Sequence, residues 1–179
     1  MSKYLMASLA VLLFPVVLNG GAALMSKMSG RRPPEKPLNQ RLCGYNVEDV
    51  KRNWTLIKGA GELKAEEKLL EYDRAFPIFY GPALAASLLI ASSMLGWPTQ
   101  RLLLLIPVVV GMVADCVENT QLLGQLRIFS AGKVEDLVPQ SIKIASAATS
   151  IKLVALCAAS VFLIGLIVAL VARGGRGGP

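Results

Sequence analysis

The stretch LLLLIPVVVGMVADCVEN, residues 102–119, decides how the fold of this chain is interpreted. Residues 102–114 carry no polar side chain, but Asp115, Glu118 and Asn119 follow directly. A helix needs about 20 residues to cross the hydrocarbon core of a bilayer, so residues 102–114 alone are too few. This segment therefore crosses a membrane only if its two carboxylates are carried into the bundle together with the leucines that follow.

Three further apolar runs are long enough to cross without such an exception: residues 4–25, 75–95 and 153–172. The composition agrees, since 54% of the 179 residues are hydrophobic and 17% are charged, against about 45–50% and about a quarter in soluble domains. The sequence therefore predicts an all-α, polytopic membrane protein with four transmembrane helices in an antiparallel bundle. Residues 75–172 would form its three-helix part.

The residue types exclude several classes of site. There is no histidine, which excludes histidine-based catalytic triads and most zinc sites. Cys43, Cys116 and Cys157 are far apart and form no metal-binding spacing, so neither a disulfide scaffold nor a zinc site is expected. The net charge of +7 is spread between the apolar runs rather than gathered in one arm, so nucleic-acid binding is not expected. No cofactor follows from the sequence.

Between the first two apolar runs lies a polar segment, residues 26–74, whose proline-rich start at residues 29–37 is typical of a linker. Asn46 is expected to cap a helix, and apolar residues follow on one face of that predicted helix: Val47, Val50, Trp54 and Ile57. Residues 62–72 predict a second helix that leads into the membrane. Both are expected to be amphipathic and to lie on the headgroups, with Trp54 as an anchor. A small cap packed on the bundle fits the pattern equally well.

The positions of lysine and arginine predict the orientation. Segment 26–76 holds eleven of them and segment 123–152 holds four. The four on the other side are Lys3, Arg101, Arg173 and Arg176. Both long segments are therefore expected in the cytoplasm and both termini outside, with residues 173–179 as a disordered tail.

One alternative concerns the N-terminus. Lys3, the apolar run and the small residues that follow also fit a cleavable signal peptide over residues 1–25, which would leave three helices. The sequon Asn53-Trp54-Thr55 offers a check, because glycosylation at Asn53 would place this segment in a lumen.

The polar residues of the third helix share one face, since Asp115, Glu118 and Asn119 are spaced i, i+3, i+4. Asp115 lies about 21 Å beyond Arg101 at about 1.5 Å per residue, in the cytoplasmic leaflet. The second and fourth helices bring further polar residues to the same depth. Candidate ligand-binding or ion-binding residues are Asp73, Arg74, Tyr80, Asp115, Glu118, Asn119, Thr149 and Lys152.

The expected cluster has three interpretations. In one, the charged ends of Glu118 and Lys152 extend to the interface between membrane and water. Ion pairs and hydrogen bonds inside a bundle fix the register of its helices. Alternatively, intramembrane ionisable groups mark a site for a headgroup, an ion or a proton. Any metal ion would be held by Asp115 and Glu118, the only acidic pair in the apolar runs. Two acids against two bases, Arg74 and Lys152, would make the cluster neutral.

Three sequence elements resemble a loosely defined group of four-helix membrane proteins that have no established activity. These elements are Asp73-x-x-Phe76-Pro77-x-x-Tyr80-Gly81, Asp115-x-x-Glu118-Asn119 and Thr149-x-x-Lys152. The resemblance covers about residues 45–155, and the Asp-x-x-Glu-Asn element is its most specific part. It marks these residues without implying a role for them.

Three functions follow as hypotheses. The preferred one is a non-enzymatic accessory protein, or a binding protein for lipid or a protein partner, because it requires no catalytic group. The second is an enzyme acting on a phospholipid or isoprenoid phosphate, in which the acidic pair holds a divalent cation and Arg74 and Lys152 bind phosphate. The third is a small proton-coupled transporter that uses Glu118. The expected partners are the lipid bilayer and a membrane protein or second copy of the chain.

Overall fold

The computed structural model describes residues 3–30, 38, 41–97 and 100–174, and these are helical with no strand among them. The long α-helices are α1 (Lys3–Ser29), α4 (Pro77–Met94), α5 (Ile106–Ser130) and α6 (Pro139–Gly174). Two shorter ones, α2 (Val47–Gly59) and α3 (Leu63–Ala75), lie between α1 and α4 in sequence. Short 3₁₀ helices precede α5 and α6: η2 (Gln100–Leu105) and η3 (Val134–Asp136).

Four helical stretches are long and apolar enough to cross a membrane, as judged from length and composition. They are Leu12–Ser29, Leu63–Met94, Leu102–Ser130 and Pro139–Arg173. The 36 residues of α6 extend about 54 Å, well beyond a hydrocarbon core of about 30 Å. Part of this helix must therefore project from any membrane that it crosses.

The helix α5 runs without interruption through the polar end of the decisive stretch. It continues past Asp115 and Glu118 as far as Ser130, with Pro107 in its first turn, where the missing N–H of proline costs no hydrogen bond. The prediction that the third apolar run continues as a helix through its carboxylates is confirmed. Their side chains are buried among the other helices.

The start of α2 also follows from local sequence. Asn46 Oδ1 accepts from the backbone N–H of Asp49 at 2.9 Å, and Asp49 Oδ2 accepts from the N–H of Asn46 at 3.0 Å. This reciprocal pair satisfies two backbone donors that a helix start leaves without partners. The predicted cap at Asn46 is confirmed.

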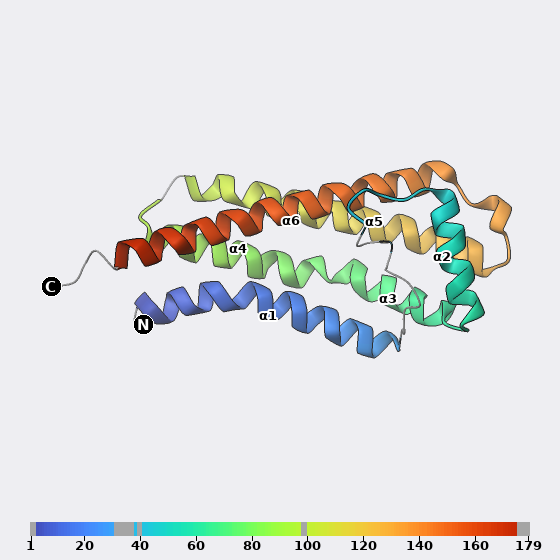
Figure 1. Cartoon of the computed structure of the whole chain (residues 1–179), viewed down its shortest axis with the longest axis horizontal. Helices are drawn as coiled ribbons and strands as arrows, with labels where there is room; N and C mark the ends of the chain where they lie inside the picture. The colour runs from blue at the N-terminus through green and yellow to red at the C-terminus, as the bar shows by residue number, and fades with distance from the viewer. Residues whose placement is uncertain (1–2, 31–37, 39–40, 98–99, 175–179) are drawn as a thin grey trace.

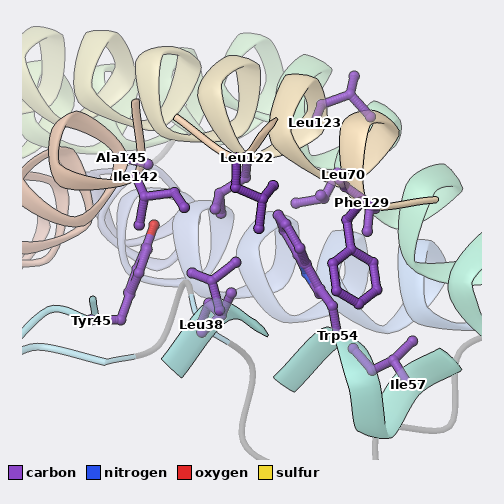
Figure 2. Close-up of a cluster of buried hydrophobic side chains, with 13 residues drawn as sticks. Leu38, Tyr45, Trp54, Ile57, Leu70, Leu122, Leu123, Phe129, Ile142 and Ala145 are labelled. Carbon is purple, nitrogen blue, oxygen red and sulfur yellow. The ribbon is translucent and has the colours of Figure 1, made fainter. Parts of the chain in front are cut away.

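One end of the molecule is a helical cap, built where α2 lies across α3, α5 and α6 (Figure 1). Its core joins side chains from all four helices and from the segment before α2 (Figure 2): Leu38, Tyr45, Val50, Trp54, Ile57, Leu70, Leu122, Leu123, Leu126, Phe129, Leu137, Ile142 and Ala145. Trp54 is 0% exposed, and its ring centroid lies 5.6 Å from that of Phe129. The expectation of Trp54 as a headgroup anchor is therefore wrong, because its indole fills the cap interior.

The sequon cannot report on orientation in this fold. Asn53 is 2% exposed and faces the cap interior on α2, next to the buried Trp54. An oligosaccharide on Asn53 would require α2 to leave the structure. Orientation needs a different probe.

Three expected boundaries differ from the structure. Segment 123–152 was expected to hold a long connection, but α5 continues to Ser130 and α6 begins at Pro139, so only residues 131–138 connect them. The expected tail at 173–179 begins later, because α6 includes Arg173, whose Nη1 donates to the carbonyl of Leu95 at 2.9 Å. The expected linker at residues 29–37 begins later than predicted, because Ser29 still belongs to α1. Residues 31–37 and 175–179 lie outside the described residues.

A second apolar core runs along α1, α4, η2, α5 and α6. Close approaches at glycines hold the helices together along it. A methyl group at Gly21 of α1 would overlap the ring of Phe76, and one at Gly81 of α4 would overlap the side chain of Met112 of α5. By contrast, nothing lies within 4 Å of the position of a Cβ at Gly20. The packing of α1 against Phe76 therefore depends on Gly21 and not on its neighbour.

We expect Gly21→Leu to destabilise the docking of α1, because overpacking a close contact costs about 1–3 kcal/mol. Gly20→Leu is the matched control, since it brings the same change in helix propensity without an overlap. Thermal unfolding of both variants in lipid nanodiscs measures the difference. Equal melting temperatures for the two variants would contradict the close contact.

Candidate functional site

A network of polar side chains lies between the cap core and the second apolar core. The face of α5 that carries Asp115, Glu118 and Asn119 points at α4 and α6, because positions i, i+3 and i+4 lie on one side of a helix. All three side chains are buried, and Glu118 and Asn119 are 0% exposed. Buried ionised groups require partners, and the neighbouring helices supply them.

Lys152 of α6 is shared by both carboxylates. Its Nζ lies 3.0 Å from Asp115 Oδ1 and also contacts Glu118 Oε2. Lys152 is itself buried, so its three ammonium protons are directed into the network rather than into solvent. One positive charge thus serves two carboxylates.

Asp115 accepts two further hydrogen bonds. The hydroxyl of Tyr80 on α4 donates to Asp115 Oδ2 at 2.9 Å, and Nδ2 of Asn119 donates to Asp115 Oδ1 at 2.9 Å. A carboxylate is an acceptor only, so the amide atom that faces it must be the nitrogen. The amide oxygen of Asn119 then points elsewhere; it is buried and has no hydrogen-bond partner.

Glu118 is joined to the cap through Thr149 and Tyr45. Thr149 Oγ1 donates to Glu118 Oε1 at 2.5 Å and lies 3.3 Å from the hydroxyl oxygen of Tyr45. Thr149 has one hydroxyl proton, so when Thr149 donates to Glu118, Tyr45 must supply the proton between the two hydroxyls. Burial, and secondarily the charge of Glu118, raises the pKa of Tyr45 above its ordinary value. Tyr45 therefore remains a neutral hydroxyl.

The segment that carries Tyr45 is fixed to α6 by backbone contacts. The N–H of Tyr45 donates to Ser146 Oγ at 2.9 Å, and Ser150 Oγ donates to the carbonyl of Leu42 at 3.0 Å. Gly44 has a φ of 76°, and a Cβ there would lie 2.5 Å from Ser146 Oγ. Only glycine fits both the conformation and the space. In Figure 2 the Tyr45 hydroxyl points toward α6 beside Ile142 and Ala145.

Sequence reasoning missed Tyr45 as a member of the network. The sequence does contain one relevant pattern. Tyr45 directly precedes the cap residue Asn46, and Val50 lies four residues after Asn46, which is the spacing of a hydrophobic staple. Both side chains are buried in the cap core. That spacing predicts packing on α2, whereas the contact with Thr149 depends on how the segment folds back across α6.

Six of the eight predicted residues come together in the network: Tyr80, Asp115, Glu118, Asn119, Thr149 and Lys152. Asp73 is buried near them, and its charge acts on Tyr80 and Lys152. Arg74 is exposed and pairs with neither carboxylate; its charge acts on Cys116 instead. The expected balance of two acids and two bases is therefore wrong, because Arg74 follows Asp73 on a helix and points to a different side.

A divalent metal ion does not fit this arrangement. The ammonium of Lys152 already contacts Asp115 and Glu118, the two residues expected to hold such an ion. Among the described residues there is no group of three acidic, cysteine or histidine side chains that could hold a metal ion. Both carboxylates are thus already engaged by ion pairs and hydrogen bonds.

No family model, curated protein or solved structure matches this chain. The resemblance to a group of four-helix membrane proteins consequently stays a prediction. The function must be argued from the residues themselves.

Lys152→Met should destabilise the protein by about 3–5 kcal/mol, because it leaves two buried carboxylates without a counter-ion. Adding Glu118→Gln to this variant should restore part of the loss, since it removes one of those charges. Chemical unfolding in detergent micelles measures both effects, with Lys143→Met, at an exposed lysine of the same helix, as the control. A Lys152→Met variant as stable as the control would show that the ion pairs contribute nothing.

Proposed function

We propose that this chain is an integral membrane protein whose four long helices cross the bilayer in alternating directions, and that it acts as a non-enzymatic accessory or binding protein. Large apolar side chains on the outward faces of α5 and α6 support the membrane location. They include Val109, Val113, Val154, Val161, Ile164 and Val168. A contiguous apolar surface of this kind is unfavourable in water and suits contact with lipid chains.

The arrangement of the ends supports one orientation. The start of α1 and the end of α6 lie at the same end of the molecule as the end of α4 and the start of η2 (Figure 1). The cap lies at the opposite end. Most of the lysine and arginine residues belong to segments 26–76 and 123–152 of the sequence. By the positive-inside rule the cap is cytoplasmic and both termini are outside.

The packing of α1 supports its retention in the mature protein. Phe14 of α1 is buried, and Gly21 lies against Phe76. Removal of residues 1–25 as a signal peptide would expose Phe76 and this side of α4. We therefore assign α1 as the first transmembrane helix.

The polar network lies at the cytoplasmic edge of the bilayer in this orientation. Tyr80 is about 22 Å along α4 from Leu95, at the outer end, and the hydrocarbon core is about 30 Å thick. The network therefore joins the lipid-embedded part of the bundle to the cytoplasmic cap. At this position the polar network can hold the cap at a fixed distance and angle to the membrane.

The burial of the network carries the proposal that the protein is not an enzyme. Glu118, Asn119 and Thr149 are each 0% exposed, and the ionisable groups of the network contact one another. Neither carboxylate of the network, Asp115 or Glu118, is open to a phosphate ester, and Lys152 is already paired with both of them. Arg74, expected to bind phosphate, lies apart from the network. The protein then acts through its surfaces, with lipid around the bundle and a membrane-protein partner at the cap.

Purified protein in vesicles that contain phospholipid and polyprenyl phosphate should release no product, with or without Mg²⁺. Purification from native membranes under mild detergent should yield one partner in a fixed ratio to this chain. The control is the same purification with Leu56→Asp, which changes an exposed apolar residue of the cap. Mg²⁺-dependent turnover that Asp115→Asn abolishes would establish the enzyme instead.

Cys43 provides the probe of orientation that the sequon cannot. It is exposed on the segment before α2. In a variant with Cys116 and Cys157 changed to serine, a membrane-impermeant maleimide should label Cys43 in inside-out vesicles and not in sealed cells. The Cys43→Ser variant controls for background. Labelling of sealed cells would place the cap outside and reverse the proposed topology.

A further inference from the structure

The buried network has an unbalanced charge. Asp115 and Glu118 contribute two negative charges, and Lys152 contributes the one positive charge that contacts them. Within the described part of the chain no second base pairs with either carboxylate. An uncompensated charge at such a position is strongly unfavourable.

A second, independent observation lies inside the same network. The amide oxygen of Asn119 is buried and has no donor, because the nitrogen of the same amide is held by Asp115. Buried acceptors in folded proteins are almost always paired. The charge balance indicates a ligand that brings a positive charge, and this acceptor shows that the network is not fully hydrogen-bonded.

We propose that the network is a binding site for one proton, held by the carboxyl pair of Asp115 and Glu118, and that its occupancy is transmitted to the cap through Thr149 and Tyr45. A proton supplies the missing positive charge, since a protonated carboxyl is neutral. It also needs no coordination sphere, whereas a metal ion would have to displace Lys152. The proposal goes beyond an accessory function and does not rest on it.

The groups that face the carboxyl pair come from every neighbouring element. Lys152 approaches from α6, Tyr80 from α4 and Tyr45 from the segment before α2. On α3, the charge of Asp73 acts on Lys152. Tyr80 and Tyr45 are neutral hydroxyls, so the excess charge rests on carboxylates alone. The proton is exchanged with solvent water, and no other bond is formed or broken.

The hydrogen bonds of Thr149 connect this proton to the cap. While Glu118 is ionised, Thr149 donates to a carboxylate, and Tyr45 donates to Thr149 in turn. Hydrogen bonds to a charged acceptor are stronger than neutral ones. When Glu118 is protonated, this chain loses its charged acceptor, and Thr149 can turn to the carbonyl of Ala145, which lies 3.0 Å away. The attachment of Tyr45, and with it the cap segment, is then weaker.

Infrared spectroscopy of the full chain in lipid nanodiscs tests the proton site directly. Over the pH range in which the protein stays folded, difference spectra should contain the C=O absorption of one buried carboxylic acid that disappears as the pH rises. This absorption should be lost in Glu118→Gln or in Asp115→Asn, and it should persist in Glu48→Gln, a control at an exposed glutamate. Absence of the absorption in the wild type, or its persistence in both network variants, would overturn the proposal.

Hydrogen exchange of residues 42–50 tests the link to the cap. After correction for intrinsic exchange, these amides should exchange about fivefold to tenfold faster when the proton is bound, the difference between a charged and a neutral acceptor. Tyr45→Phe should abolish this pH dependence, because it removes the hydroxyl that contacts Thr149. A pH dependence that is unchanged in Tyr45→Phe would show that the cap does not sense the proton through this route.

Discussion

The rest of this structure depends on one lysine that is shared by two carboxylates. Lys152 of α6 reaches both Asp115 and Glu118 of α5 at the level where the apolar helices meet the cap. Without it, the two charges on α5 could not be buried, and the third apolar run would be too short to form part of the bundle. The shared ammonium is therefore what allows α5 to continue as one helix from the apolar end of the molecule into the cap.

The network also links two cores that have different surroundings. On one side, the apolar core along α1, α4, η2, α5 and α6 lies beneath exposed valines and isoleucines. On the other, Trp54 and Phe129 fill a cap whose helices also carry exposed charges. Apolar contacts are tolerant of sliding and rotation, whereas ion pairs and hydrogen bonds require a defined geometry. The polar layer thus sets the register between the two parts, as buried polar groups do in other helical assemblies.

This register has a consequence for the cap segment. Thr149 and Ser146 of α6 both bind the backbone or side chain of Tyr45, while Gly44 permits the close approach. The segment before α2 is consequently tied to the same turns of α6 that hold the carboxylates. A change of charge inside the network can act on the cap without any movement of the long helices.

The sequence alone determined the four apolar helices, the cap of α2 at Asn46 and the common face of Asp115, Glu118 and Asn119. These features depend on local spacing and on the length of apolar runs, which can be read along one chain. Only the tertiary structure decided that Trp54 is buried, that Arg74 points away and that Tyr45 joins the network. Each of these outcomes depends on which side of one helix meets another, and that is set by packing between segments far apart in sequence. Thus the decisive stretch at residues 102–119 predicted a helix with buried acids, but the sequence could not show that a single base, Lys152, would serve them both.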